Sequence, residues 1–316
     1  MTCLVTISAR RHLKGMTGPF HSGEREIQRR AGVAEEAQEV GWIIGGTLTP
    51  AMGRFLARQR LAVASTLDAG GWVWASLLTG VPGFITPDGA ERLRVAAQPI
   101  AGDPLRTNLA KDGRPDVGLV VLDPRTRQRM RVNGVIERFD DHGLQIGIRQ
   151  AYGNCPKYIQ LREPEPDVPA APGRPTVAAR LDQRQRAWIE NADTLFIASF
   201  HPVGGADASH RGGLPGFVRV VGEGRIVFPD YLGNAMFNTL GNLVEYPRAG
   251  LLFVDFTTGD ILQVTGGARL EDDRSVMFEV EEVRETRAAS PLRMRLVEYS
   301  PASPDVARRA GEARKE

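Results

Sequence analysis

Two stretches of this 316-residue chain share one frame, because residues 75–84 read ASLLTGVPGF and residues 208–217 read ASHRGGLPGF. Four landmark pairs extend the match at offsets of 132 to 134 residues: Leu61 with Leu195, Pro82 with Pro215, Asp123 with Asp255, and Gly134 with Gly266. So steady an offset predicts an internal duplication. The period is far longer than a solenoid repeat, so each copy is predicted to be a small domain of its own.

Each predicted copy contains short apolar runs bounded by Gly, Asp and Pro, which are typical of strands. The runs lie at 61–66, 71–78 and 117–123 in the first copy and at 194–200, 216–221 and 249–256 in the second. Together with few helices and many Gly/Pro turns, they predict a mainly β fold of two small barrels with flanking helices. Two copies on one chain would imitate a two-fold dimer, with sites at the interface between them.

The stretch REPEPDVPAAPGRPT at 162–176 is predicted to be a linker, because proline at this density neither pairs in a sheet nor continues a helix. The charged stretch 23–40 predicts one surface helix, and 181–193 predicts another. The predicted organisation is a disordered or over-extended start at 1–19 (the start codon being Met1 or Met16), a first copy with its leading helix at 20–161, the linker at 162–176, a second copy at 177–301, and a polar tail at 302–316.

Composition excludes several classes of function. The 40 basic residues nearly balance the 38 acidic ones, so we expect no nucleic-acid partner and no acidic membrane surface. Cys3 and Cys155 stand in unrelated contexts, so neither a disulfide framework nor a metal site is expected. The apolar runs are far shorter than the roughly 20 residues of a membrane span. The start has the wrong order of charges for a secretory signal. We therefore expect a soluble, cytoplasmic protein.

Polar chemistry is concentrated in the second copy. It reads His-Arg-Gly at 210–212 where the first copy reads Leu-Leu-Thr at 77–79. Ser209 and Arg211 are residue types that bind phosphate, since a guanidinium makes charge-assisted, bidentate contacts with it. The repeated PGF is interpreted as architecture, and the unrepeated residues as the guide to function.

Residues 229–243, PDYLGNAMFNTLGNL, form the second polar stretch. Gly233–Asn234 predicts a helix start with Asn234 as its N-cap. Asn234, Asn238 and Asn242 would then line one face of that helix. A helix N-terminus favours a phosphate, and the aromatic residues nearby suit a flat cofactor.

Each feature also has a plain structural interpretation. An asparagine row is usually solvated, and His210 is equally expected to be a loop residue bonded to backbone. Cys155 precedes proline and is more typical of a small packing residue than of a redox centre. Arg127, Arg129 and Arg131 share one face of the predicted strand 127–139, where a solvated face is favoured over contact with an anionic substrate or a partner.

Taken together, these residues resemble the pyridoxamine 5′-phosphate oxidase-like family of FMN-binding split β-barrel proteins. SHRGGLPGF, FPDYLGN, GNLVEYPRAGLLFVDF and LQVTG follow in the family's order between residues 193 and 270. The likeness is closest to a long, two-copy branch, through FHSGEREIQRRAGV at 20–33, YGNCPKYIQLRE at 152–163 and PLRMRLVEYSP at 291–301. The resemblance therefore covers nearly all of 20–301. It implies tandem split barrels packed as a pseudo-dimer, with FMN held by the second copy at the interface with the first.

The resemblance also implies a set of cofactor-binding residues. From the second copy they are Ser209, His210, Arg211, Gly212, Pro229, Asp230, Asn234 and Asn242, and from the other half Asn154, Cys155, Lys157 and Tyr158. Related shorter proteins often have a basic residue directly after Gly-Asn, where this chain has Ala235. Lys157 or Arg162 is expected to replace it. The first copy is expected to hold no flavin of its own.

The function implied is that of an FMN-dependent oxidoreductase acting on a small molecule, with His210 and Cys155 as candidate catalytic residues. Electrons would come from NAD(P)H or a separate reductase, because no dinucleotide-binding GxGxxG follows a strand. Two alternatives stay open: a haem-handling protein with His201 or His210 as axial ligand, and a flavin-binding module without catalysis. The chain is expected to be a monomer or a homodimer.

Overall fold

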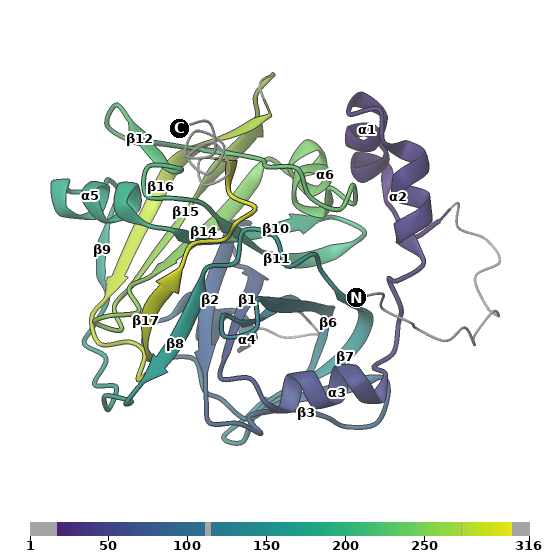
Figure 1. Cartoon of the computed structure of the whole chain (residues 1–316). Coiled ribbons are helices and arrows are strands. Elements are labelled where there is room, and N and C mark those ends of the chain that lie inside the picture. The colour runs from purple at the N-terminus through teal and green to yellow at the C-terminus, as the bar shows by residue number, and fades with distance from the viewer. Residues whose placement is uncertain (1–17, 111–114, 273, 305–316) are drawn as a thin grey trace, which may run out of the picture.

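The computed structural model describes residues 18–110, 115–272 and 274–304 (Figure 1). Most strands pair antiparallel in two large sheets, and helices lie at their margins. This confirms the predicted mainly β fold with flanking helices. Within the described ranges, no helix is long and apolar enough to cross a membrane.

The first sheet is built from residues 61–153. Its strands are β1 (Leu61–Leu67), β2 (Val73–Thr79), β3 (Ile85–Pro87), β4 (Arg92–Val95), β5 (Asp116–Asp123), β6 (Gln128–Asp140) and β7 (Gly143–Gly153). They are arranged in the order β2-β1-β5-β6-β7-β4-β3. The central strands β1 and β5 are buried on both sides, which explains why their sequences are apolar runs and do not alternate.

The second sheet is built from residues 194–286. Its strands are β10 (Thr194–His201), β11 (Gly205–Gly212), β12 (Arg219–Val221), β13 (Arg225–Pro229), β14 (Arg248–Val254), β15 (Ile261–Leu270) and β16 (Ser275–Thr286). Their order is β11-β10-β14-β15-β16-β13-β12, with β9 (Thr176–Ala178) added beside β16. Strand for strand this is the order of the first sheet, which is the arrangement that an internal duplication predicts.

The two sheets face each other through one shared apolar cluster. It takes Val63, Ala75 and Val120 from the first sheet and Phe196 and Leu252 from the second, all fully buried. The backbones approach so closely that a Cβ on Gly118 would lie 2.5 Å from the carbonyl oxygen of Ala206. A Cβ on Gly250 would lie 2.6 Å from the carbonyl oxygen of Val73. The contact between the sheets is therefore as tightly packed as a domain core.

The leading segment forms two helices, where the sequence predicted one over 23–40. They are α1 (Ser22–Arg30) and α2 (Ala34–Gly41). Gly32 lies between them with a φ of +69°, a conformation that cannot continue a helix. The start of α1 is fixed by a capping box between His21 and Glu24.

The remaining helices are short. They are α3 (Pro50–Ala57), α4 (Pro104–Leu109), α5 (Gln183–Asn191) and α6 (Asn238–Glu245). Thr49, Asp103 and Asp182 cap the first three of these through their side chains. Helix α5 lies inside the predicted range 181–193, and α6 packs against α1 and β10.

The predicted linker is partly strand. β8 (Leu161–Glu165) pairs with β17 (Arg293–Glu298) as a separate two-stranded ribbon, and Pro164 lies opposite Met294 in it. The expectation that the whole of 162–176 stays outside a sheet is therefore wrong. A two-stranded ribbon has only edge strands, and proline is tolerated there because its missing N–H can face away from the partner. The ribbon joins the end of the first half to the tail of the second.

Candidate functional site

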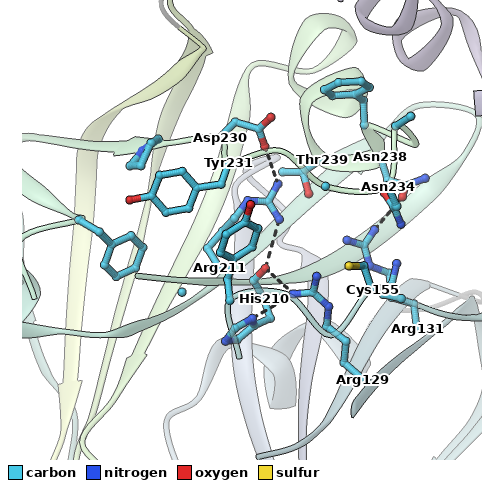
Figure 2. Close-up of a pocket in the computed structure, with 18 residues that line it drawn as sticks. Arg129, Arg131, Cys155, His210, Arg211, Asp230, Tyr231, Asn234, Asn238 and Thr239 are labelled. Atoms are coloured by element: carbon cyan, nitrogen blue, oxygen red, sulfur yellow. Dashed lines mark hydrogen bonds and ion pairs between the residues drawn. The ribbon is translucent and has the colours of Figure 1, made fainter. Parts of the chain in front are cut away.

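A pocket lies between the two sheets, where β6 and the loop after β7 meet β11 and residues 229–239 (Figure 2). Both halves of the chain line it. It therefore lies at the interface where the resemblance places the cofactor.

Many residues expected at the site do line this pocket. They are His210, Arg211, Gly212, Pro229, Asp230, Asn234, Asn154, Cys155 and Tyr158. Ser209 lies directly behind the wall, fully buried, where its hydroxyl accepts hydrogen bonds from Arg131 and Thr239. The structure thus brings together segments that are about 80 residues apart in the sequence.

Three expected residues lie elsewhere. Asn242 is buried beneath α1, where it accepts from His21 Nε2 at 2.9 Å and donates to Ser199 Oγ at 2.9 Å. Lys157 lies on an exposed turn outside the pocket lining. Arg162 is paired with the carboxylate of Asp193, so its charge is already compensated.

Arg129 and Arg131 are the site residues that the sequence interpretation missed. Both project from β6 into the site, and Arg131 is buried, with Nη1 3.1 Å from Asp207 Oδ2. The preference for a solvated face is therefore wrong for these two, although Arg127 does pair with Glu298 near the surface. Side chains two apart on a strand share a face. The signal was present in the sequence, but only the second sheet turns that face into a pocket wall.

Arg129 lies in an unusual electrostatic environment. Burial lowers its pKa to about 9, with repulsion from Arg131 and Arg211 acting in the same direction. Burial by itself would lower the pKa of Arg131 as well, but the adjacent Asp207 carboxylate leaves that pKa raised. The lowered pKa of Arg129 reflects burial together with repulsion between neighbouring guanidinium groups, and an anionic ligand would relieve that repulsion.

Arg211 comes from β11 and Arg129 from β6, and both donate to the His210 carbonyl oxygen. Figure 2 shows its guanidinium between the Asp230 carboxylate and the main chain of His210, with Nη2 3.6 Å from Asp230 Oδ1 and Nη1 3.2 Å from the His210 carbonyl oxygen. Burial lowers the pKa of Arg211, and Asp230 opposes that shift. The 3.6 Å separation is too long for a strong bidentate pair, so the guanidinium keeps hydrogen-bonding capacity for another group.

His210 was expected in a loop and lies instead on strand β11, opposite Phe196 of β10. Its ring is buried, and burial together with Arg129 and Arg211 holds its pKa well below the ordinary value. The ring is therefore neutral. Arg129 Nη1 lies 3.0 Å from Nδ1, and because arginine only donates, the ring proton sits on Nε2. Nε2 is buried with no hydrogen-bond partner in the described part of the chain.

The loop before α6 corrects the predicted helix start. The helix begins at Asn238, after Ala235 and Phe237 take left-handed φ values of 60° and 56°. Such residues interrupt a helix, so Asn234 is no N-cap. Its Oδ1 accepts from Met236 N within a tight turn at 3.3 Å. The loop therefore bends over the pocket and gives it a wall.

Asn238, expected on the same helix face as Asn242, joins the site at its base. Its Oδ1 accepts from Arg131 Nη1 at 3.0 Å, and its Nδ2 donates to Glu24 Oε1 at 2.5 Å. Glu24 belongs to α1, so the leading helix reaches the base of the site through Asn238. Nothing in the spacing of the sequence signalled this contact.

Aromatic rings and a thiol complete the lining. Tyr158 has a φ of 68°, and its ring centroid lies 5.1 Å from that of Tyr231 across the junction of the two halves. Cys155 is a half-buried free thiol in the lining, and the described residues contain no second cysteine to resolve it. His201 lies away from the pocket, stacked on His21 at 3.8 Å, with Nδ1 accepting from Val203 N and Gly204 N.

The arrangement suits a ligand that combines an anionic group with a flat ring. Arginines from both halves supply the positive charge, and Phe217, Tyr158 and Tyr231 supply apolar ring surface. Four buried polar atoms of lining residues have no partner within the described ranges, namely Arg129 Nε, Arg131 Nε, Asn154 Oδ1 and His210 Nε2. Buried polar groups are normally satisfied, so these atoms mark where a polar ligand fits.

Comparison with known proteins bears on the second half of the chain. Residues 181–308 match the family model described as pyridoxamine 5′-phosphate oxidase. No curated protein matches the chain.

Two solved structures have a weak likeness to the chain. One is described as MrkH, a c-di-GMP-dependent transcription regulatory factor, with 10% identity, 84% of this chain and 87% of that chain covered, and a TM-score of 0.21. The other is the MrkH–c-di-GMP complex of K. pneumonia, with 8% identity, 75% and 83% covered, and a TM-score of 0.19. At such TM-scores neither likeness bears on fold or function. The family match, by contrast, agrees with the antiparallel β fold, and residues 181–308 carry a domain of the pyridoxamine 5′-phosphate oxidase-like family.

Proposed function

We propose that the pocket binds FMN and that the protein is a flavin-dependent oxidoreductase acting on a small molecule. One observation carries the proposal: Arg129, Arg131 and Arg211 converge from both halves on a pocket with aromatic walls, and the half that contributes Arg211 matches a flavin-binding family. The unpartnered polar atoms of that wall fit a cofactor with a phosphate and a ring rich in hydrogen-bonding atoms.

Arg211 and Arg129 are assigned to the phosphate. Ala235 stands where related proteins often have a basic residue, and a replacement charge has to come from another element. Arg162 is held by Asp193, and Lys157 lies outside the lining. Arg129 lines the pocket and has no carboxylate partner among the described residues, so it is the better replacement.

Arg131 is assigned a positioning role. Asp207, Ser209 and Asn238 already occupy its guanidinium, which ties β6 to β11 and α6 at the base of the pocket. Its charge still contributes to the positive potential that attracts an anion.

One flavin per chain is proposed, because the equivalent place in the first sheet is filled. There Ser76 donates to the carboxylate of Asp103 at 2.5 Å, and Gln263 donates to the same carboxylate at 3.0 Å. Leu77 and Leu78 replace His210 and Arg211, so the positive charge is absent. A buried carboxylate in that position repels a phosphate.

Bound FMN supplies the redox chemistry, and the chain supplies the environment. Tyr158, Tyr231 and Phe217 exclude water from part of the pocket. His210 holds its proton on Nε2 and is available as a neutral hydrogen-bond donor. Cys155 is assigned to packing at the pocket edge. Because the chain has no dinucleotide motif, a transiently bound nicotinamide or a separate reductase is proposed as electron donor.

The test is flavin binding by wild-type protein and by Arg211→Ala. Wild type is expected to bind about one equivalent of FMN, seen as quenching of flavin fluorescence. Loss of a charge-assisted contact worth roughly 1.5–3 kcal/mol weakens FMN binding by at least about tenfold in the variant. The control is Arg219→Ala, an exposed arginine on β12 whose removal leaves FMN affinity unchanged.

Unchanged affinity in Arg211→Ala would remove Arg211 from the site. A Soret band without flavin in the purified protein would replace the proposal by the haem-handling alternative, with His210 as the ligand to test. If the protein binds flavin but neither NADPH nor a reductase reduces it, the result would favour the alternative of a flavin-binding module without catalysis.

A further inference from the structure

A second cavity of about 380 Å³ lies on the other side of β6. Residues 58–61 at the end of α3, the turn 123–126 after β5, and the start of β17 form its walls. It shares no lining residue with the flavin pocket. Gln128 lines this cavity and Arg129 lines the flavin pocket, as expected for neighbours on one strand.

The charged residues of this lining are unbalanced. The lining contains four arginines, Arg58, Arg60, Arg125 and Arg293, and a single carboxylate, Asp123. The Asp123 carboxylate accepts hydrogen bonds within the turn 123–126, from Arg125 N at 3.0 Å and from Thr126 Oγ1 at 2.9 Å.

Only one of these arginines has an acidic partner within residues 18–110, 115–272 and 274–304. Arg60 pairs with Asp167. Arg58 and Arg125 form no ion pair in that part of the chain, although both are exposed. The lining therefore keeps a net positive charge, which favours an anion.

Of the four arginines, Arg293 is the strongest evidence for an anion site, because its side chain is buried, with a relative exposure of 8%. One terminal nitrogen donates to the carbonyl oxygens of Ser290 and Leu292, at 2.7 and 2.9 Å. Among the described residues, no carboxylate lies within salt-bridge distance of it. The guanidinium packs against the backbone of Gly259, so an anion in the cavity would compensate this buried charge by long-range attraction and not by direct contact.

Part of the remaining wall is apolar. Its accessible apolar surface comes from Pro82, Pro164 and Met294, and Leu61, Leu122 and Leu292 are buried behind it. A bare inorganic ion would leave this surface wet, whereas a ligand with an apolar body would cover it.

The corresponding groove of the second sheet is a natural comparison. It is lined by residues 191–194 and 254–257, at the same offsets that relate the two halves. There Arg162 is paired with Asp193, and Arg184 is paired with Glu285. The groove of the second sheet thus neutralises its own arginines, so the excess charge is particular to the first cavity.

We propose that this cavity is a binding site for a small amphiphilic acid, with the acid group at Arg58 and Arg125, the charge of Arg293 adding to the attraction, and the apolar body against Pro82, Pro164 and Met294. The site is separate from the flavin pocket and stands whether or not FMN binds there. An aromatic or branched aliphatic carboxylate is the class of ligand that this lining recognises.

The experiment is calorimetric titration of the full chain with 2-naphthoate, 2-naphthalenemethanol and inorganic phosphate. We expect one equivalent of naphthoate to bind, and the neutral alcohol and phosphate each to bind at least about tenfold more weakly. The double variant Arg58→Glu/Arg125→Glu should weaken naphthoate binding at least about tenfold. Arg54→Glu, an exposed change on α3 outside the cavity, should leave it unchanged.

Arg293→Gln should also weaken naphthoate binding. If Arg293→Gln does not fold, the double variant at the exposed Arg58 and Arg125 still tests the site. The proposal is overturned if wild type shows no saturable binding of naphthoate, or if the alcohol or phosphate binds equally well. An unaltered affinity in the double variant would overturn it too. If naphthoate binding is lost only in Arg211→Ala, naphthoate binds in the flavin pocket and the proposal of a second site is refuted.

Discussion

Glu24 is the residue whose environment departs most from what its sequence context suggests. It stands in a charged surface helix, yet it is buried against the base of the pocket with a relative exposure of 4%. Burial raises its pKa from the ordinary 4.5 to about 7, and hydrogen bonds from His21 N and Asn238 lower the pKa by a smaller amount. Asp207 and Arg131 face it from the second and first sheets and act in opposite directions.

The pH dependence of stability should report this burial. A carboxyl with a raised folded pKa stabilises fully below its unfolded pKa and loses that contribution as pH rises to about 7. His21 acts in the opposite direction, because burial lowers its pKa to about 4 and its contribution is lost as pH falls from 6.5. The wild-type curve therefore mixes these two groups with other buried groups such as Asp103, whose pKa burial raises to about 6.

The Glu24→Gln variant separates them. Its free energy of unfolding, relative to wild type, should increase by on the order of 2–3 kcal/mol between pH 5 and pH 8, measured by urea denaturation. Glu26→Gln is the matched control, because Glu26 is paired with Arg29 and Arg30 on the exposed side of the same helix. Its difference curve should be flat over that range. A flat curve for Glu24→Gln would show that this carboxyl is not buried in solution.

The residues of the site differ in how well the sequence alone identifies them. His210 and Arg211 could be singled out because an unrepeated pair stands inside a repeated frame. Arg129 and Arg131 were visible as a row on one strand face, but the face that a strand buries depends on its neighbour. Glu24 could not be found at all, since its contact with Asn238 spans 214 residues.

At the scale of elements, α1 is held to α6 by a close backbone approach. A Cβ on Gly241 would lie 2.5 Å from Glu24 N, and one on Gly23 would lie 2.2 Å from the Gly241 carbonyl oxygen. Gln28 Nε2 adds a hydrogen bond to the Met236 carbonyl oxygen, at 3.2 Å, in the loop that forms the pocket wall. The leading helix therefore supports the loop as well as the base of the site.

Gly241→Ala tests this contact through the sign of its effect. Inside an ordinary helix the change stabilises by about 0.5–1 kcal/mol. Here the added methyl group collides with α1, so we expect a loss of about 1–3 kcal/mol in the free energy of unfolding and faster proteolysis after Arg29 or Arg30. Val244→Ala, exposed on the same helix, should change stability by less than about 0.5 kcal/mol. A stabilised Gly241→Ala protein would refute the close contact.

Strands were easier to predict than helices. The apolar runs at 61–66, 194–200 and 249–256 each coincide with a strand to within a few residues. The helix expected from Asn234 begins four residues later, because left-handed residues at 235 and 237 are set by the pocket wall and not by local propensity.

On the scale of the whole molecule, the halves depend on each other. Their shared apolar cluster draws on both sheets, and β17 of the second half pairs with β8, which lies N-terminal to the second half at the start of the predicted linker. Arg129 and Arg131 reach the pocket from the first sheet. A second half alone would expose this surface and lack both arginines.

We therefore expect the isolated fragment 177–301 to self-associate and to bind FMN at least about 100-fold more weakly, because the Arg129 contact, the positioning by Arg131 and the wall formed by the first half are lost together. Gel filtration and flavin titration measure the two effects. As control, the full chain cleaved at a protease site introduced within the exposed segment 168–174 should keep its halves together and its FMN affinity. A monomeric fragment with full affinity would show that the first half is dispensable.

The sequence by itself determined the mainly β fold, the matching course of its two halves and the two stretches where polar residues gather. These follow from local patterns of apolar residues, glycine and proline, which act over a few neighbours. Only the tertiary structure decided that Arg129 and Arg131 face the pocket, that Glu24 supports its base, and that Asn242 lies beneath α1. The physical reason is that burial and electrostatic partners are set where distant segments meet, and the spacing of residues along one strand or helix does not specify which segment that will be.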